Sequence, residues 1–233
     1  MKIELFDRYD LRTRICAFIF VMSPFLLDAY ILVDAVRSFS STIIISAILI
    51  ASSGLFSCWI RYWGNKVEQK DYIVELLSPT STELTQMDKK RYYEKLVKLE
   101  PSFAGVESND SAGTQETLKA VSTWLKQKTR GDSFSLIREE NLNYGFMRNV
   151  YSLKSVFLWT FSAYNAFLLG VLNTLNQGRT FKEYFASIPV EHVACGVCHV
   201  AVYLIWCLGI TEAVLEFTAK KYAKAVIGAI DEL

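Results

Sequence analysis

The stretch ACGVCHV, residues 194–200, places two cysteines and a histidine at a spacing that can hold a cofactor. Cys195 and Cys198, followed directly by His199, match the C-x-x-C-H motif that attaches haem covalently. On a helix, His192, Cys195 and His199 share one face, at positions i, i+3 and i+7. His192 and His199 are the only histidines in the chain, so haem and metal ligation are the chemistries to weigh first.

The surroundings of this motif favour helix packing over a cofactor. The charged middle of the chain has no cysteine or histidine, so it brings no further ligand. Ala194, Gly196 and Ala201 join the two cysteines in a small-residue surface of the kind that lets membrane helices approach closely. Haem and metal ligation stay open as alternatives, but packing is the expected role and no cofactor is predicted.

The sequence contains no recognisable catalytic set. It has no glycine-rich phosphate loop, no H-E-x-x-H metal pair and no G-x-S-x-G nucleophile turn. Its five cysteines all lie in or beside apolar stretches, which is not the disulfide framework of a small secreted domain. We therefore expect a protein that is not an enzyme.

The apolar residues collect into four blocks instead of following an amphipathic period. The blocks are residues 15–33, 43–60, 155–174 and 193–211, and Asp28 is the only charged residue in them. A helix of about 20 apolar residues crosses a hydrocarbon core about 30 Å thick. Because such blocks leave almost no polar face for water, we predict an all-α membrane protein with four transmembrane helices. No cleavage-site pattern follows the first block, so we expect it to be retained.

The basic residues predict the orientation of the chain. Outside the blocks, 22 Lys and Arg residues fall on one side and 3 on the other, and the richer side is expected in the cytosol. Both termini and the long middle segment would then be cytosolic. We divide the chain into an N-terminal transmembrane hairpin, a cytosolic helical domain inserted between the second and third spans, and a C-terminal hairpin with a cytosolic tail. The boundaries are residues 1–61, 62–152 and 153–233.

Helical patterns fill the inserted segment. We expect one helix to continue the second span through residues 61–77, and a second over 82–99, closed by Pro101. A third is capped by Ser111 or Thr114 and runs to about residue 130. A last helix begins near Ser133 and enters the third span unbroken.

Basic residues gather in the second half of this segment. Its totals of 15 basic and 13 acidic residues do not favour nucleic acid, but residues 119–130 hold four basic residues and no acidic one. Trp124 lies among them, and basic side chains with nearby aromatics can bind phosphates and stack bases. A solvated helix face is the alternative. The candidate ligand-binding residues are Lys119, Lys126, Lys128, Arg130, Arg138 and Arg148.

Residues 123–154 resemble a motif of a poorly characterised family of bacterial four-span membrane proteins. The motif runs W-L-x-x-x-T-R, then E-N-x-x-Y-G-F-x-R-N, then L-K at the start of a span. The chain departs from it at Ser135, Met147 and Ser152. The matching residues are Trp124, Leu125, Thr129, Arg130, Phe134, Leu136, Glu140, Asn141, Tyr144, Gly145, Phe146, Arg148, Asn149, Leu153 and Lys154.

Some members of that family resemble the membrane effector of the Hailong antiphage defence system. The resemblance implies a homo-oligomeric ion channel, for example a tetramer, in the bacterial inner membrane. A nucleotide or short single-stranded DNA oligomer, made by a partner nucleotidyltransferase, would gate it at the cytosolic domain, and its opening would cause ion leakage and growth arrest. The alternative from another class is a non-conducting membrane scaffold or receptor that recruits a cytosolic partner.

The segment YGFMRN gives the channel hypothesis a physical coupling element. Tyr144, Gly145, Phe146 and Asn149 lie where a cytosolic helix would enter the third span, so a change in the cytosol could tilt that span. Gly145 would let another backbone approach closely. An ordinary interfacial anchor of aromatic and basic residues is the alternative.

The first block carries the candidate pore residues. Asp28 is a costly carboxylate in lipid, so it should face water, find a partner or lie near the outer interface. Phe18, Phe20 and Phe25 could form a hydrophobic constriction, or they could simply face lipid. Asn165 and Thr160 of the third block could hydrogen-bond another helix. The basic residues at the inner mouth favour anions.

Overall fold

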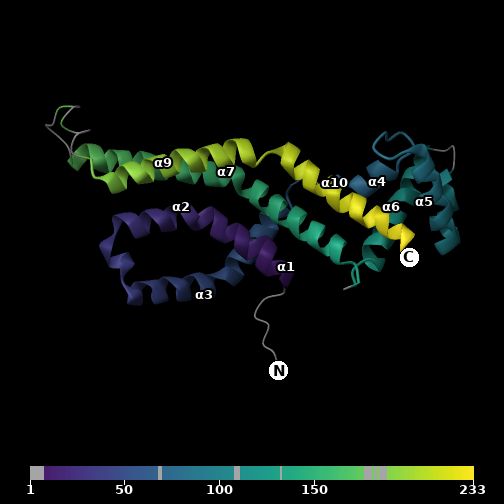
Figure 1. The fold of residues 1–233 in the computed structure, drawn as a ribbon, viewed down its shortest axis with the longest axis horizontal. Helices are drawn as coiled ribbons and strands as arrows, with labels where there is room; N and C mark the ends of the chain where they lie inside the picture. Colours follow the sequence, from purple (N-terminus) through teal and green to yellow (C-terminus); the bar gives the residue numbers. More distant parts are fainter. Residues whose placement is uncertain are drawn as a thin grey trace, which may run out of the picture. The chain divides into compact units, whose positions relative to one another are not determined.

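A computed structural model describes residues 8–67, 70–107, 111–131, 133–175, 180, 183 and 188–233. Every regular element in these residues is helical (Figure 1). The chain forms two compact units. We call Met1–Val67 with Phe146–Val214 the apolar unit, and Glu68–Gly145 with Leu215–Leu233 the polar unit.

The apolar unit contains two helical hairpins. α2 and α3 form the first, and α7 and α9 lie side by side in the second (Figure 1). Short helical turns extend or join these helices. The elements are α1 (Arg8–Asp10), η1 (Leu11–Ile15), α2 (Cys16–Leu32), η2 (Asp34–Arg37), α3 (Phe39–Gly64), α7 (Ser135–Leu175), α9 (Val190–Leu204) and η4 (Ile205–Gly209).

Three helices in the described residues are long and apolar enough to cross a membrane. They contain the first, third and fourth apolar blocks of the sequence. The remaining block lies in α3, an unbroken helix of 26 residues, of which several side chains are outside the described set. The count of four spans and the cytosolic placement of the charged segment stay predictions. The three helices are Leu11–Leu32, Ser135–Thr174 and Val190–Gly209.

Large apolar side chains on these helices point away from the rest of the chain. Trp159 is 79% exposed, Leu208 is 72% exposed and Leu55 on α3 is 71% exposed. In water such apolar surfaces would favour association with other molecules. Lipid or another apolar surface can cover them without this unfavourable exposure. The exposure therefore agrees with the length and composition of the helices.

Pro24 lies inside α2 without ending it. Proline has no N–H, so the carbonyl of Phe20, four residues earlier, loses its helical donor. The hydroxyl of Ser23 donates to that carbonyl at 2.8 Å. An unsatisfied carbonyl in hydrocarbon costs several kcal/mol, so Ser23 supplies what the helix needs to continue to Leu32.

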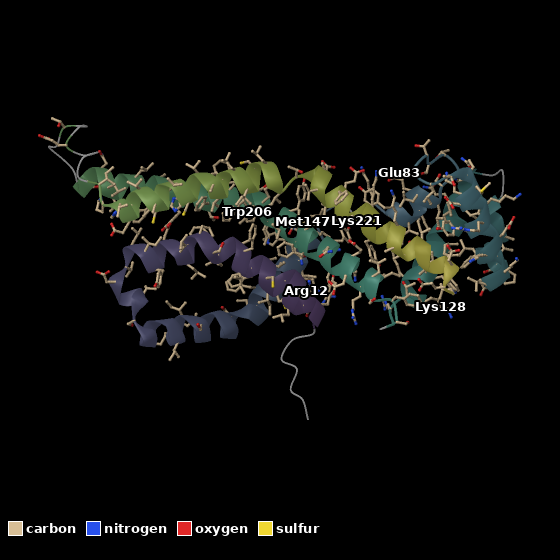
Figure 2. All side chains as sticks on the ribbon, in the orientation of Figure 1. Arg12, Glu83, Lys128, Met147, Trp206 and Lys221 are labelled. Atoms are coloured by element: carbon tan, nitrogen blue, oxygen red, sulfur yellow. The ribbon has the colours of Figure 1, made fainter. Side chains whose placement is uncertain are left out.

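Stacked aromatic rings hold the apolar unit together. Trp206 of η4, which is labelled in Figure 2, lies in the middle of these rings. It stacks on Phe157 of α7 with ring centroids 3.9 Å apart, and on Phe20 of α2 at 5.4 Å. Phe161 continues the stack 5.2 Å from Phe157. Such pairs contribute about 0.5–1.5 kcal/mol each beyond area burial. They tie helices from both hairpins to one another.

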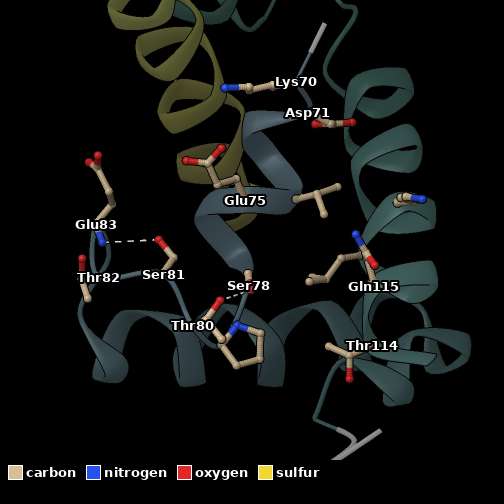
Figure 3. A pocket seen from close by; sticks show the side chains of 14 residues that line it. Lys70, Asp71, Glu75, Ser78, Thr80, Ser81, Thr82, Glu83, Thr114 and Gln115 are labelled. Carbon is tan, nitrogen blue, oxygen red and sulfur yellow. Dashed lines mark hydrogen bonds between the residues drawn. The ribbon is translucent and has the colours of Figure 1, made fainter. Parts of the chain in front are cut away.

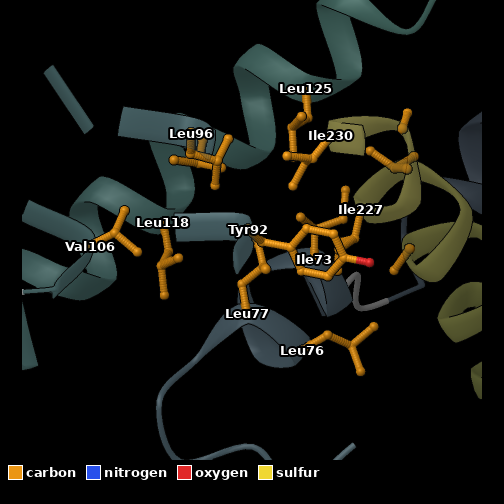
Figure 4. Close-up of a cluster of buried hydrophobic side chains, with 14 of the residues drawn as sticks. Ile73, Leu76, Leu77, Tyr92, Leu96, Val106, Leu118, Leu125, Ile227 and Ile230 are labelled. Atoms are coloured by element: carbon orange, nitrogen blue, oxygen red, sulfur yellow. The ribbon is translucent and has the colours of Figure 1, made fainter. Parts of the chain in front are cut away.

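The polar unit has a separate hydrophobic core (Figure 4). Ile73 and Leu76 of α4 meet Leu96 of α5, Leu125 of α6 and Ile227 of α10, all at most 1% exposed. Each such side chain contributes about 1.5–3 kcal/mol on burial. The C-terminal tail is therefore part of this unit. Its elements are α4 (Tyr72–Leu77), α5 (Gln86–Leu99), η3 (Pro101–Glu107), α6 (Ser111–Lys128), α10 (Glu212–Gly228) and η5 (Ala229–Asp231).

The expectation of one helix through residues 61–77 is wrong. α3 ends at Gly64 and α4 begins at Tyr72. Glycine favours a helix end. The carboxylate of Asp71 then accepts a hydrogen bond from the N–H of Ile73 at 3.2 Å, which gives α4 its own N-terminus.

The other helices of the segment agree with the sequence. The hydroxyl of Thr85 accepts from the N–H of Asp88 at 3.1 Å and starts α5, which ends before Pro101. α6 begins at Ser111, so Thr114 lies within the helix and does not cap it. α7 runs 41 residues without interruption and joins the last charged helix to the third apolar block.

Lys89 of α5 is buried although it is charged, with 1% of its surface exposed. Its ammonium donates to the carbonyls of Ser78 at 2.8 Å and Pro79 at 3.3 Å, and also to that of Ser81. These carbonyls follow the end of α4, where no helical donor reaches them. Lys89 thus fixes the connection between α4 and α5.

We expect Lys89→Met to destabilise this connection by about 2 kcal/mol, because three backbone carbonyls lose charge-assisted hydrogen bonds. Hydrogen exchange of the α4 amides in the full chain should become about 30-fold faster. Lys90→Met removes an exposed charge next to it and should leave the exchange unchanged. Equal exchange rates in the two variants would contradict this role for Lys89.

Candidate functional site

The apolar unit encloses a polar network made by three of its helices. Asp28 of α2 is 1% exposed and His199 of α9 is 8% exposed. His199 Nε2 lies 2.7 Å from Asp28 Oδ2, and His199 Nδ1 lies 2.6 Å from Oδ1 of Asn165 on α7. The imidazole therefore links α2 to α7 and α9.

The hydrogen bonds of Asn165 define the direction of the network. Its Nδ2 donates to the carbonyl of Phe161 at 2.7 Å, so its Oδ1 faces His199 as an acceptor. Nδ1 of His199 must then carry a proton and donate it. One further proton is shared between His199 Nε2 and Asp28 Oδ2, either as an imidazolium–carboxylate pair or as a carboxylic acid that donates to a neutral ring.

Asp28 keeps one oxygen without a hydrogen bond. Its Oδ1 is buried and has no partner of adequate geometry among the described residues. The hydroxyl of Tyr164 and the thiol of Cys195 both face this carboxylate, but neither completes a hydrogen bond to Oδ1. Burial of a carboxylate oxygen without a hydrogen bond is costly.

The immediate walls of the network are aromatic. The ring of Phe161 lies edge-on to His199 with centroids 5.0 Å apart, and the ring of Tyr164 lies at 6.2 Å. These rings keep the imidazole away from lipid and hold its plane. In the described part of the chain, no three His, Cys, Asp or Glu side chains come together in a way that could hold a metal ion.

The sequence identified parts of this network but did not connect them. From the sequence, Asp28 was expected to find a partner, face water or lie near the outer interface, and Asn165 was expected to hydrogen-bond another helix. His199 was grouped with His192 and Cys195 instead. A usable signal was present, because Asp28 and His199 are the only acidic and imidazole side chains inside the apolar blocks.

The expected pore phenylalanines contact other rings of the same chain. Phe18 is 6% exposed and stacks on Phe56 of α3 with centroids 4.0 Å apart. Phe20 stacks on Trp206. Phe25 meets Phe161 edge-on at 5.6 Å, next to the polar network.

The expected ligand-binding residues belong to both units. Lys119, Lys128, Arg130 and Arg138 are exposed in the polar unit, whereas Arg148 belongs to the apolar unit. Two of them have defined roles inside their own unit. The ammonium of Lys128 lies 5.7 Å from the centroid of the Trp124 ring. Lys126 pairs with Asp71 at 2.9 Å.

The expected coupling residues straddle the division of the chain. The boundary between the units falls between Gly145 and Phe146, within the continuous helix α7. Tyr144 stacks on Tyr222 of α10 in the polar unit, with centroids 6.2 Å apart. In the apolar unit, Phe146 meets Phe20, and Asn149 donates to the carbonyl of Thr13 at 2.8 Å.

An open groove of about 1040 Å³ lies in the polar unit (Figure 3). Its charged lining is mixed, and Lys119 is the only expected ligand-binding residue among the described residues that line it. The lining contains three acidic and two basic side chains, and this balance does not favour the binding of a chain of phosphates. The charged lining residues are Lys70, Asp71, Glu75, Glu83 and Lys119.

The rim of this groove is held by ion pairs. Glu83 accepts from Lys220 and Lys224 of α10, each at 2.9 Å. These bonds lower the pKa of Glu83 to about 2. Burial raises the pKa of Asp71, but hydrogen bonds from Lys126 and Ser122 outweigh it and hold that pKa below its ordinary value.

We expect the polar network to be energetically coupled. Asp28→Leu leaves the His199 donor buried without an acceptor, and His199→Leu leaves the carboxylate unpaired, so each should destabilise the chain by about 1–3 kcal/mol. The destabilisation of the double variant should be at least about 1 kcal/mol smaller than the sum of the two single destabilisations. Unfolding in mixed detergent micelles measures these free energies.

A control pair lies on α7 and α9, two of the three helices that carry the network. Ser162 of α7 and Tyr203 of α9 form an exposed hydrogen bond of 2.7 Å. Its coupling should be near the average for membrane helices, about 0.6 kcal/mol. Coupling between Asp28 and His199 that does not exceed this control would contradict a cooperative network.

The pKa of Glu83 predicts a pH dependence. Its pKa in the folded chain, about 2, lies below the ordinary value of 4.5, so the contact stabilises the chain at neutral pH and is lost as the pH falls from about 4.5 to about 2. Glu83→Gln should therefore lower the thermal unfolding temperature at pH 7, and the difference from wild type should shrink below pH 4.5. Glu94→Gln, an exposed change on α5, should show no such convergence.

Comparison with known proteins finds no relative of this chain. No protein-family model, no curated protein and no solved structure matches the chain. What the chain does must therefore be argued from its own residues, and the polar network among the apolar helices is the most distinctive chemistry that the described residues offer.

Proposed function

We propose that the chain is a subunit of a homo-oligomeric membrane channel in which the Asp28–His199–Asn165 network controls ion passage. The observation that carries this proposal is an ionisable pair, with one unsatisfied carboxylate oxygen, buried among helices with the character of membrane spans. Ionisable groups at such positions cost several kcal/mol and mark ion pathways or proton relays in membrane proteins.

Stability alone gives little reason to keep this pair. Apolar side chains of similar volume in place of a buried ion pair are often neutral or stabilising. The surrounding rings of Phe161 and Tyr164 would accommodate such side chains well. Retaining Asp28 and His199 is better explained by a role in which the shared proton moves or a bond opens.

The network is also suited to switching. It joins α2 of the first hairpin to α7 and α9 of the second, so a change in the shared proton alters the attraction between the hairpins. α7 carries Asn165 and extends as one helix to Ser135 in the polar unit. A ligand that moved the start of α7 would act on the network through that continuous helix.

Conduction requires several copies. Four helices of one chain rarely enclose a path, whereas a symmetric ring of copies can. Exposed apolar residues such as Leu55, Trp159 and Leu208 provide surfaces where copies could meet. By resemblance we propose a bacterial inner-membrane effector of phage defence with four spans and both termini in the cytosol. Its ligand would be a nucleotide or short DNA oligomer acting on the cytosolic helices.

Ion flux in liposomes tests this proposal. The reconstituted chain should pass potassium or chloride, and a short single-stranded DNA oligomer should change the flux by about 5–150-fold, the range of typical ligand coupling. Asp28→Asn should alter the flux or its dependence on pH. Ser162→Ala, a change on the lipid-exposed side of α7, should leave flux unchanged.

The result that would overturn the proposal is equally defined. A reconstituted protein that folds and inserts, yet passes neither ion with or without the oligomer, does not conduct. That outcome would favour a membrane scaffold or receptor that recruits a cytosolic partner.

A further inference from the structure

A second, smaller cavity lies at one end of the apolar helices. It has a volume of about 260 Å³ and is formed by the end of α3 and the middle of α7. Lysines, aromatic rings and hydroxyls line it, and no acidic residue does so in the described part of the chain. The lining residues are Trp63, Lys66, Val67, Tyr151, Ser152, Lys154 and Ser155.

The sequence places this cavity at the edge of the hydrocarbon region. Residues 43–60 of α3 carry no charge, and the cavity residues begin three positions later at Trp63. On α7 the order is reversed, because Lys154 directly precedes the uncharged residues 155–174. The cavity therefore lies at the depth where lipid headgroups meet apolar helices.

The ammonium of Lys66 is positioned by aromatic rings. It lies 4.5 Å from the centroid of the Tyr62 ring and 4.8 Å from that of Trp63. No carboxylate of the described residues forms an ion pair with it. Ring faces attract an ammonium without supplying a counter-charge, so these contacts do not compete with an anion for Lys66.

Lys154 supplies a second cation with a defined position. Its ammonium donates to the carbonyls of Ile210 at 2.7 Å and Cys207 at 3.3 Å, where the helical turn η4 ends. These two bonds use two of its three protons. One proton remains for a ligand, and the anchored ammonium does not have to be ordered on binding.

Gly64 keeps the two walls of the cavity close together. A Cβ atom at this position would lie 2.5 Å from Oδ1 of Asn149 on α7 and 3.9 Å from Nε of Arg148. A larger residue at position 64 would therefore force the Asn149 side chain to shift, although Asn149 is held by its hydrogen bond to the carbonyl of Thr13.

We propose that this cavity binds a phosphate group. Anchored cations with an aromatic neighbour at the edge of the apolar helices match the sites that membrane proteins use for anionic lipid headgroups. A phosphate also suits a cavity of this size, because its oxygens accept from Lys66 and Lys154 together while Ser155 donates from α7. The same chemistry would accept a soluble phosphate, and the experiment separates the two sources.

The test measures thermal unfolding of the full chain in detergent with added phosphatidylglycerol, phosphatidylcholine or inorganic phosphate. Phosphatidylglycerol should raise the unfolding temperature more than phosphatidylcholine does. Lys66→Gln should require about tenfold more phosphatidylglycerol for the same shift. Arg61→Gln is the matched control, because it removes an exposed charge from the same helix end outside the cavity lining. Ser155→Asp, which places a carboxylate in the cavity, should weaken the shift independently.

Each outcome decides the inference without reference to conduction. If phosphatidylglycerol raises the unfolding temperature, and Lys66→Gln weakens this effect while Arg61→Gln preserves it, the ligand is a lipid phosphate. Equal protection by inorganic phosphate with the same variant pattern supports a soluble phosphate. Indistinguishable responses of Lys66→Gln, Arg61→Gln and wild type would overturn the site, whether or not the chain conducts ions.

Discussion

The apolar helices depend on one constraint: a polar group placed among them must find its partner within the protein. Asp28 meets this requirement with one of its two oxygens, through His199, and His199 meets it through Asn165. Ser23 replaces the donor that Pro24 removes from α2. Hydrocarbon offers no water to satisfy these groups, so each bond fixes a local geometry that would be optional in a soluble protein. The bond between Asp28 and His199 also reaches across from one hairpin to the other.

The polar unit is stabilised in a different way. Water can satisfy its surface, so its order comes from a hydrophobic core that gathers α4, α5, α6 and the C-terminal α10. Charged residues then fix connections at particular points. Lys89 holds the carbonyls after α4, and Glu83 attaches the following segment to α10 through two lysines. The mixed charge of the groove beside Glu83 makes it a poor site for a phosphate chain, whereas the cavity at Lys66 and Lys154 has the required charge.

α7 is the element shared by the two units. It begins among charged residues, passes Tyr144 and Phe146, borders the cavity at Lys154 and carries Asn165 of the polar network. Its 41 residues form one helix without an interruption. This continuity is the physical reason to connect ligand binding, a headgroup contact and the Asp28–His199 pair in one proposal.

The sequence alone determined where the long apolar helices lie, because block length and the absence of charge depend on composition and on nothing distant. It also predicted the end of α5 before Pro101 and the continuity of α7, whereas the start of α5 at Gln86, after the Thr85 cap, lies four residues beyond the predicted start at residue 82. The break between Gly64 and Tyr72 was missed, although Asp71 offered a local cap for α4. The pairing of Asp28 with His199, 171 positions apart, and the entry of α10 into the core of the polar unit were decided by tertiary packing. Helical periodicity specifies the face that a residue occupies, but only packing selects which distant face it meets.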